Sequence, residues 1–194
     1  MQSRVGVGAI QQRALQRRRQ PASVAAQARV CELTDYLQPT DTLDALVSAA
    51  REHPCVMFTG PRGSGKSTLA AALALPAAAG GHVPDGFVHA IAFATSTSTM
   101  DSLSAALAGS LRVSVDGFAQ AVNAFDAGLD AAEREGLPAL QRGILGPLRL
   151  MKLQRPVRLV IDALDELPEA TQQVLRSAVA DARAGVTRSP RARG

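Results

Sequence analysis

The segment from Gly60 to Ser67 constrains this chain more than any other part of its sequence. It reads Gly-Pro-Arg-Gly-Ser-Gly-Lys-Ser and fits the pattern GxxxxGK[ST] in full. Its glycines allow the backbone to curl so that successive N–H groups point inward, and a helix starting at the end of the loop would add the positive end of its dipole. Such a loop is suited to holding the phosphates of a nucleotide.

The residues on either side supply the context that this pattern requires. The apolar run Cys55-Val56-Met57-Phe58 lies between Pro54 and Gly60 and is too short for a helix, so it predicts a buried strand, with Cys55 as a small core residue. The alanine-rich stretch from Ser67 to Leu75 predicts a helix that Pro76 ends. A strand, a glycine loop and a helix therefore follow one another.

Lysine within the loop is informative because arginine is the usual cation of this chain. Lys66 and Lys152 are the two lysines among 21 basic residues. We expect the compact ammonium of Lys66 to reach the β- and γ-phosphates of ATP, and the Ser67 hydroxyl to bind Mg²⁺. The residues expected to bind the nucleotide are Gly60, Pro61, Arg62, Gly63, Ser64, Gly65, Lys66, Ser67 and Thr68.

A later acidic segment offers a second metal ligand. Leu159 to Asp162 reads as an apolar strand that ends in a carboxylate, and we expect Asp162 to bind Mg²⁺ together with Ser67. Asp165 and Glu166 follow within one turn of chain, where a carboxylate could polarise a water molecule for attack on the γ-phosphate. The sequence does not decide which of the two does so.

The remaining periodicity predicts an α/β fold. Further strands are expected at 87–94 and 157–161, and helices at 41–52, 103–111, 118–129 and 174–182. The stretch 140–153 is ambiguous, because Gly143, Gly146 and Pro147 interrupt an apolar helical face. Strands that alternate with helices predict a parallel sheet covered by helices.

The string from Val160 to Leu167 resembles the extended Walker B motif of NACHT-type ATPases in the STAND class of P-loop NTPases. In that motif an apolar strand is followed by Asp, a small residue, an apolar residue, Asp and Glu. The segment from Phe58 to Leu69 is similar to the Walker A region of the same family. The resemblance spans roughly residues 40 to 180 and implies a three-layer sandwich and a nucleotide-dependent signalling switch that hydrolyses ATP slowly, with Lys66, Asp165 and Glu166 as its catalytic residues.

The chain departs from this family after its Walker B helix. The family's sheet has a further strand between the strand leading to the phosphate loop and the strand corresponding to the one that ends in Asp162. Residues 185–194 are rich in Arg, Pro and Gly and predict no such strand. We therefore expect an incomplete sheet in a partial domain, in which those two strands either pair directly or leave an open edge.

Length and composition predict one globular domain, and the resemblance implies a partial, NACHT-like NTPase domain over residues 36–184. We expect a basic, flexible segment over 1–35 and a disordered tail over 185–194. No run of 18 apolar residues and no signal peptide occurs, which predicts a cytoplasmic protein without membrane contact. Two cysteines far apart indicate reduced thiols, and the three histidines have no metal-ligand spacing.

Several functions stay open at this level. A P-loop kinase would use the same loop to phosphorylate a small molecule, and an AAA+ ATPase acting on DNA would use the six arginines of residues 1–30, although nucleic acid is not the favoured partner. A fragment that binds nucleotide without hydrolysis is a further alternative. Beyond ATP and ADP, the resemblance implies self-association and separate sensor and effector domains as partners.

Overall fold

A computed structural model describes residues 24–35, 37 and 41–187 of the 194-residue chain. The architecture is mixed α/β and mostly helical, around a two-stranded parallel sheet. Strands β1 (Ala90–Phe93) and β2 (Leu159–Asp162) pair in register from Ala90 with Leu159 to Phe93 with Asp162. This arrangement is consistent with part of a P-loop NTPase fold.

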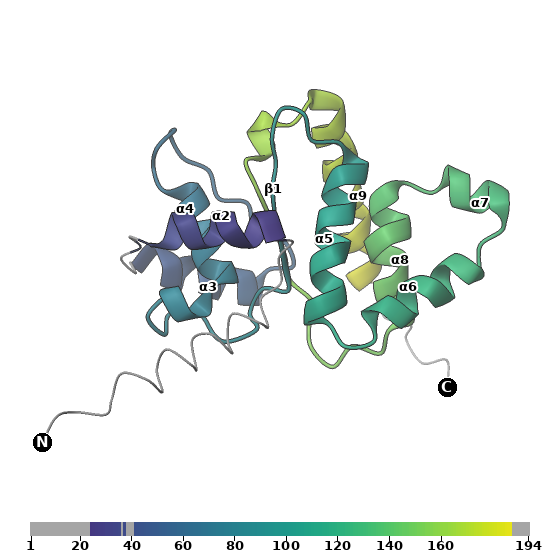
Figure 1. Ribbon diagram of the computed structural model, residues 1–194, viewed down its shortest axis with the longest axis horizontal. Helices are drawn as coiled ribbons and strands as arrows, with labels where there is room; N and C mark the ends of the chain where they lie inside the picture. The colour runs from purple at the N-terminus through teal and green to yellow at the C-terminus, as the bar shows by residue number, and fades with distance from the viewer. Residues whose placement is uncertain (1–23, 36, 38–40, 188–194) are drawn as a thin grey trace, which may run out of the picture.

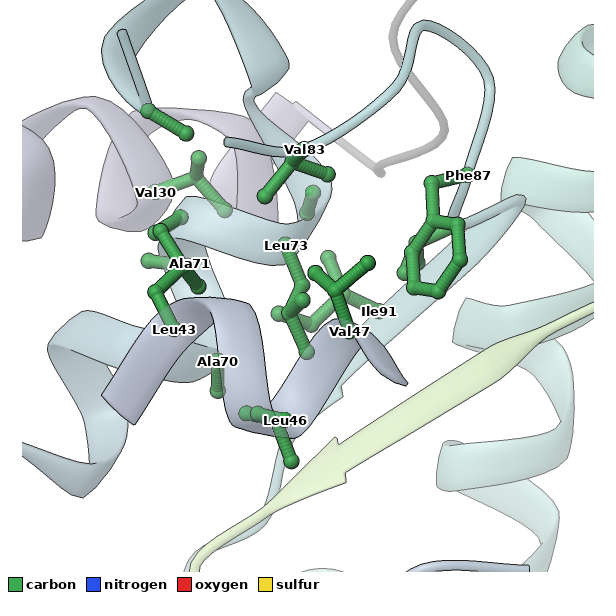
Figure 2. Packing of buried hydrophobic residues seen from close by; sticks show 14 residues of the cluster. Val30, Leu43, Leu46, Val47, Ala70, Ala71, Leu73, Val83, Phe87 and Ile91 are labelled. Carbon is green, nitrogen blue, oxygen red and sulfur yellow. The ribbon is translucent and has the colours of Figure 1, made fainter. Parts of the chain in front are cut away.

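One group of helices packs on the first face of the sheet (Figure 1). It consists of α2 (Val24–Thr34), α3 (Asp41–Glu52) and α4 (Lys66–Ala74). These helices bury a first core cluster together with Ile91 of β1, and Figure 2 shows its side chains converging from all three helices. Members of this cluster include Val30, Leu43, Val47, Ala71 and Leu73.

A second group of helices covers the opposite face. It consists of α5 (Met100–Ser114), α6 (Phe118–Ala127), α8 (Gly146–Leu150) and α9 (Glu169–Thr187). Ala90 and Ala92 of β1 belong to this second core cluster, whereas Ile91 belongs to the first. This alternation follows from the two-residue period of a strand and leaves β1 buried on both faces, as is usual in parallel sheets.

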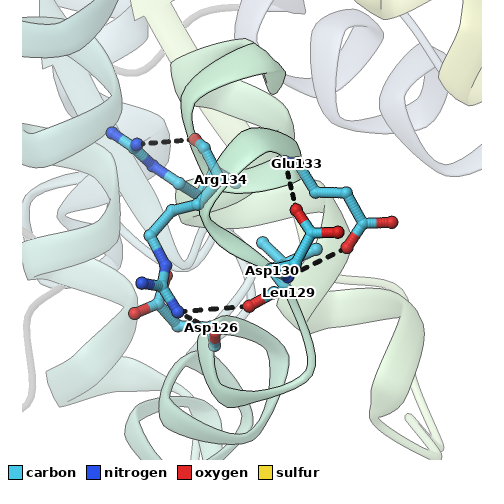
Figure 3. A network of polar contacts seen from close by, with 6 residues as sticks. Asp126, Leu129, Asp130, Glu133 and Arg134 are labelled. Atoms are coloured by element: carbon cyan, nitrogen blue, oxygen red, sulfur yellow. Dashed lines mark hydrogen bonds and ion pairs between the residues drawn. The ribbon is translucent and has the colours of Figure 1, made fainter.

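Short elements complete the chain. They are η1 (Pro76–Ala78), α7 (Ala131–Gly136), the π-helical turn η2 (Gln141–Leu145) and η3 (Leu164–Glu166). Asp130 caps α7: its Oδ1 accepts from Glu133 N at 2.8 Å, and Glu133 Oε2 accepts from Asp130 N at 3.0 Å (Figure 3). Arg134 donates to the Asp126 carbonyl at 2.8 Å, so α7 is tied to the end of α6 by polar contacts.

The strands are joined to α3 at their amino-terminal ends. Arg158 donates through Nε to the Ala50 carbonyl at 3.3 Å, and its guanidinium carbon lies 4.4 Å from the ring centroid of Phe87. Arg158 N donates to His89 Nδ1 at 3.2 Å, and His89 N donates to the Arg158 carbonyl at 2.9 Å. These contacts fix where the two strands begin.

Most of the expected elements are confirmed. The helix predicted at 41–52 is α3, and those predicted at 103–111, 118–129 and 174–182 lie within or overlap α5, α6 and α9. The helix predicted at 67–75 is α4. The strands predicted at 87–94 and 157–161 are found at β1 and β2, and the ambiguous stretch 140–153 forms η2 and α8.

The strand predicted at Cys55 to Phe58 is wrong. No backbone hydrogen bond joins residues 55–59 to another residue that the structure describes, and the segment belongs to no sheet. Met57 is 71% exposed, and Cys55 is exposed rather than a core residue. The apolar run lacks the neighbouring strand that would bury it, because β2 pairs with β1 and not with this segment.

One apolar cavity is lined by residues of both the 55–58 segment and the β2 region. It has a volume of about 480 Å³, and its lining includes Val56 and Phe58 together with Val157, Leu159 and Ile161. Direct pairing of the two segments, the kinase-like alternative, does not occur. The open edge is the arrangement found.

Helix α2 lies within the range expected to be a flexible segment. Its residue Val30 is 2% exposed and belongs to the first core cluster. Residues 1–23, with most of the basic segment, lie outside the described residues, as do residues 188–194 of the expected tail. Among the helices described, none combines the length and the apolar character needed to cross a bilayer.

Candidate nucleotide-binding site

The glycine loop has the backbone geometry that its sequence predicts. Gly63 and Gly65 have φ values of 80° and 82°, in the left-handed region that side chains other than glycine rarely adopt. Helix α4 begins at Lys66 without a side-chain cap. The amides of Gly63, Gly65 and residues 66–68 donate to no acceptor within the described parts of the chain, which leaves them available to an anion.

The ammonium of Lys66 lies against its own loop. Lys66 Nζ donates to the carbonyl of Gly60 at 2.9 Å and to that of Pro61 at 2.8 Å. Gly60 is closely approached, since a Cβ atom there would lie 3.0 Å from Ser64 Oγ. The loop is therefore closed around a cation that a phosphate could recruit.

The acidic segment emerges from the carboxyl end of β2. The carbonyl of Asp162 accepts a hydrogen bond from Ala94 N at 3.0 Å, which holds the carboxyl end of β2 beside the carboxyl end of β1. Ala163 follows with φ 57° and ψ 43°, a left-handed conformation that is uncommon for a residue with a side chain. This turn leads directly into η3, which carries Asp165 and Glu166.

One polar cavity brings the loop and the acids together. Its volume is about 800 Å³, within the usual range of ligand sites. The predicted residues that line it are Gly60, Arg62, Gly63, Gly65, Lys66, Ser67, Thr68, Asp162, Asp165 and Glu166, whereas Pro61 and Ser64 do not line it. Two segments about a hundred residues apart in sequence thus face one site, at the carboxyl end of a parallel strand.

Four lining residues were missed by sequence reasoning, namely Ser96, Arg29, Leu33 and Ala163. Ser96 follows β1, whose last residue Phe93 pairs with Asp162, so strand order brings it beside the acids. The Ser/Thr-rich loop after that strand was the available signal. Arg29 and Leu33 come from α2, and no motif marks them, because their place depends on how α2 packs against α4.

The donor atoms suit the ligands that the sequence predicts. Free amides and an ammonium match phosphate oxygens, and the Ser67 hydroxyl and Asp162 carboxylate are hard oxygen donors of the kind that Mg²⁺ prefers. Within the described residues, no group of three or more His, Cys, Asp or Glu side chains could hold a metal by itself. Magnesium would fit this pattern, because it commonly takes one or two protein ligands and completes its shell with phosphates and water.

Most of the chain matches a single protein-family model. Residues 38–189 match the model described as "AAA ATPase domain". The matched range contains the glycine loop, both strands and the acidic segment. Searches of curated proteins and of solved structures give no significant match.

Proposed function

The chain belongs to the AAA ATPase domain family of P-loop NTPases, and from that premise we propose a Mg²⁺-dependent ATP-binding switch module with slow hydrolysis, of the NACHT and STAND kind. Family membership implies binding and hydrolysis of ATP. The observation that carries the proposal is the 800 Å³ cavity in which the glycine loop faces Asp162, Asp165 and Glu166.

Each wall of the cavity has a proposed task. The amides of Gly63, Gly65 and residues 66–68 and the ammonium of Lys66 bind the phosphates, while Ser67 and Asp162 would hold Mg²⁺. The metal ion, when bound, neutralises charge that develops on the β- and γ-phosphates. Asp165 or Glu166 then orients a water molecule and accepts its proton as the γ-phosphate is attacked.

Slow turnover follows from the exposure of the acidic turn. Asp165 and Glu166 are both exposed to solvent. Electrostatic stabilisation of a transition state is strongest where water is excluded, and these carboxylates work in water. Slow hydrolysis of a bound nucleotide is what a switch requires.

The test compares ATP affinity and phosphate release for the wild type and for Asp162→Asn, Asp165→Asn and Glu166→Gln, with and without Mg²⁺. Asp162→Asn should weaken Mg²⁺-dependent binding. The variant at the water-activating position should keep binding and lose most of the residual hydrolysis, by roughly 100-fold or more. Phosphate transfer to a small-molecule acceptor at rates far above hydrolysis would instead identify a kinase and overturn the proposal.

A further inference from the structure

The polar cavity has a wall that the Walker motifs do not supply. Helix α2 contributes Arg29 and Leu33, which are four residues apart and so lie next to each other on one helical face. The helix is held in place because Val30 is buried in the first core cluster, to which Ala71 of α4 also belongs (Figure 2). This wall is therefore anchored to the same helix whose first turn carries Lys66 and Ser67.

The chemistry of this wall differs from the rest of the cavity. Among the described lining residues, Leu33 is the one apolar side chain larger than alanine. The other lining residues are glycines, alanine, hydroxyls, carboxylates and cations, which suit phosphates and a metal ion. A leucine gains nothing from a triphosphate, but it can cover the apolar face of a nucleobase.

Arg29 completes the same surface in a suitable orientation. Its Nη1 donates to Glu32 Oε2 at 2.8 Å, and its side chain is 49% exposed. A hydrogen bond of this kind lies in the guanidinium plane, so it leaves the flat faces of the group open for stacking on an aromatic ring. Arg29 is also already paired with a carboxylate, whereas Lys66 donates only to uncharged carbonyls, so Lys66 is the better placed of the two cations to bind phosphates.

We propose that Arg29 and Leu33 form the nucleoside end of the site, where they contact the base of the bound nucleotide. This inference rests on the proposed function, because it assumes that the glycine loop holds the phosphates. The nucleotide then lies with its triphosphate between the loop and Asp162, and with its base against α2. Helix α2 is thereby part of the binding site and more than an extension of the domain.

The experiment compares two ligands that share the phosphates and differ in the nucleoside, namely MgATP and Mg-tripolyphosphate. Calorimetric titration is done on the full chain and on Leu33→Ala and Arg29→Ala. We expect each variant to bind ATP about tenfold more weakly and tripolyphosphate as the wild type does. Lys66→Ala should weaken the binding of both ligands.

A matched control separates a base contact from a loss of packing. Leu37 also packs partly buried against the first core cluster but does not line the cavity. Leu37→Ala should therefore lower thermal stability as Leu33→Ala does, and leave ATP affinity unchanged.

Two outcomes overturn the inference. Wild-type binding of both ligands, with ATP affinity unaffected by Leu33→Ala and Arg29→Ala, would refute the nucleoside end and leave the proposed function standing. If the wild type binds neither ligand, both proposals fail.

Discussion

Lys66 Nζ donates to the Pro61 carbonyl at 2.8 Å, so the lysine of the glycine loop is bonded to the loop itself. Both of its hydrogen bonds are exposed to solvent, where water can replace them. We expect Lys66→Ala to change the free energy of unfolding by less than about 1 kcal/mol. The same substitution should weaken ATP binding by roughly 10- to 100-fold, because it removes a charged partner of the phosphates.

Thermal unfolding and calorimetric titration of the same samples test this separation. Lys152→Ala, at the other lysine of the chain, is the matched control and should alter neither quantity. A large loss of stability in Lys66→Ala would contradict the prediction, since it would make the lysine a structural residue.

The left-handed turn at Ala163 should respond to side-chain size. With φ at 57°, an alanine is strained where glycine is not. We expect Ala163→Gly to raise the free energy of unfolding by up to about 1 kcal/mol and Ala163→Val to lower it by more than about 1 kcal/mol. Urea denaturation measures both, and equal stabilities would show that the turn can relax to an ordinary conformation.

Two glycines of the π-helical region should give opposite results. A Cβ atom at Gly146 would overlap the ring of Phe125, whereas a Cβ atom at Gly143 has nothing within 4 Å. We expect Gly146→Ala to destabilise the protein by about 1 to 3 kcal/mol through overpacking. Gly143→Ala should be neutral or stabilising by up to about 1 kcal/mol, because alanine restricts the unfolded chain. Chemical denaturation of the two variants measures these changes. A similar loss of unfolding free energy in both variants would disprove the packing argument.

His89 should make stability depend on pH. Burial lowers the pKa of His89 below its ordinary value of 6.5, and the nearby Arg158 charge lowers it further. The unfolded chain therefore takes up a proton on this residue at a higher pH than the folded chain does. Stability should fall as pH drops through 6.5 toward the lowered folded-state pKa, and it should be fully present above 6.5.

Melting temperatures of the wild type and His89→Asn between acidic and neutral pH measure this contribution. The variant should lose part of the pH dependence, whereas His53→Asn, at an exposed histidine, should keep it. Parallel curves for the wild type and His89→Asn would count against the assignment.

Hydrogen exchange should distinguish the unpaired segment from the sheet. The amides of residues 55–59 have no backbone partner among the described residues, whereas β1 is paired with β2 and buried. Peptides covering 55–59 should exchange within the earliest time points, and peptides covering β1 should be the slower by orders of magnitude. Equal protection would mean that residues 55–59 are paired in solution.

Local sequence determined the helices, the loop and the two strands of the sheet, but it did not determine which apolar segments pair. The amphipathic period of Leu43, Leu46 and Val47 is sufficient to define α3, because a helix makes its hydrogen bonds within itself. The run Cys55 to Phe58 has the composition of a strand, yet a strand exists only with a partner, and pairing is a property of the whole fold. The strand predicted at this segment is therefore absent from the observed sheet.

The candidate site was predicted as far as its motifs extend. Gly60 to Thr68 and the acids after β2 could be recognised because each task demands a particular residue type at a fixed spacing. Arg29 and Leu33 carry no such signature, since their position follows from Val30 packing in the first core cluster. Gly143 and Gly146 appeared in the sequence as equal interruptions, and only the position of Phe125 distinguishes them.

The polar cavity crosses the division between the two core clusters. The loop is continuous with α4, which packs in the first cluster, while Asp165 and Glu166 immediately precede Leu167, which is buried in the second. A ligand that contacts both walls therefore links the two core clusters. Its binding free energy adds to the free energy of unfolding of the whole chain. With MgATP present, the parts of the chain packed in the two clusters should unfold as a single cooperative unit at a higher temperature. The sharpness of that transition would report how strongly the ligand couples the two clusters.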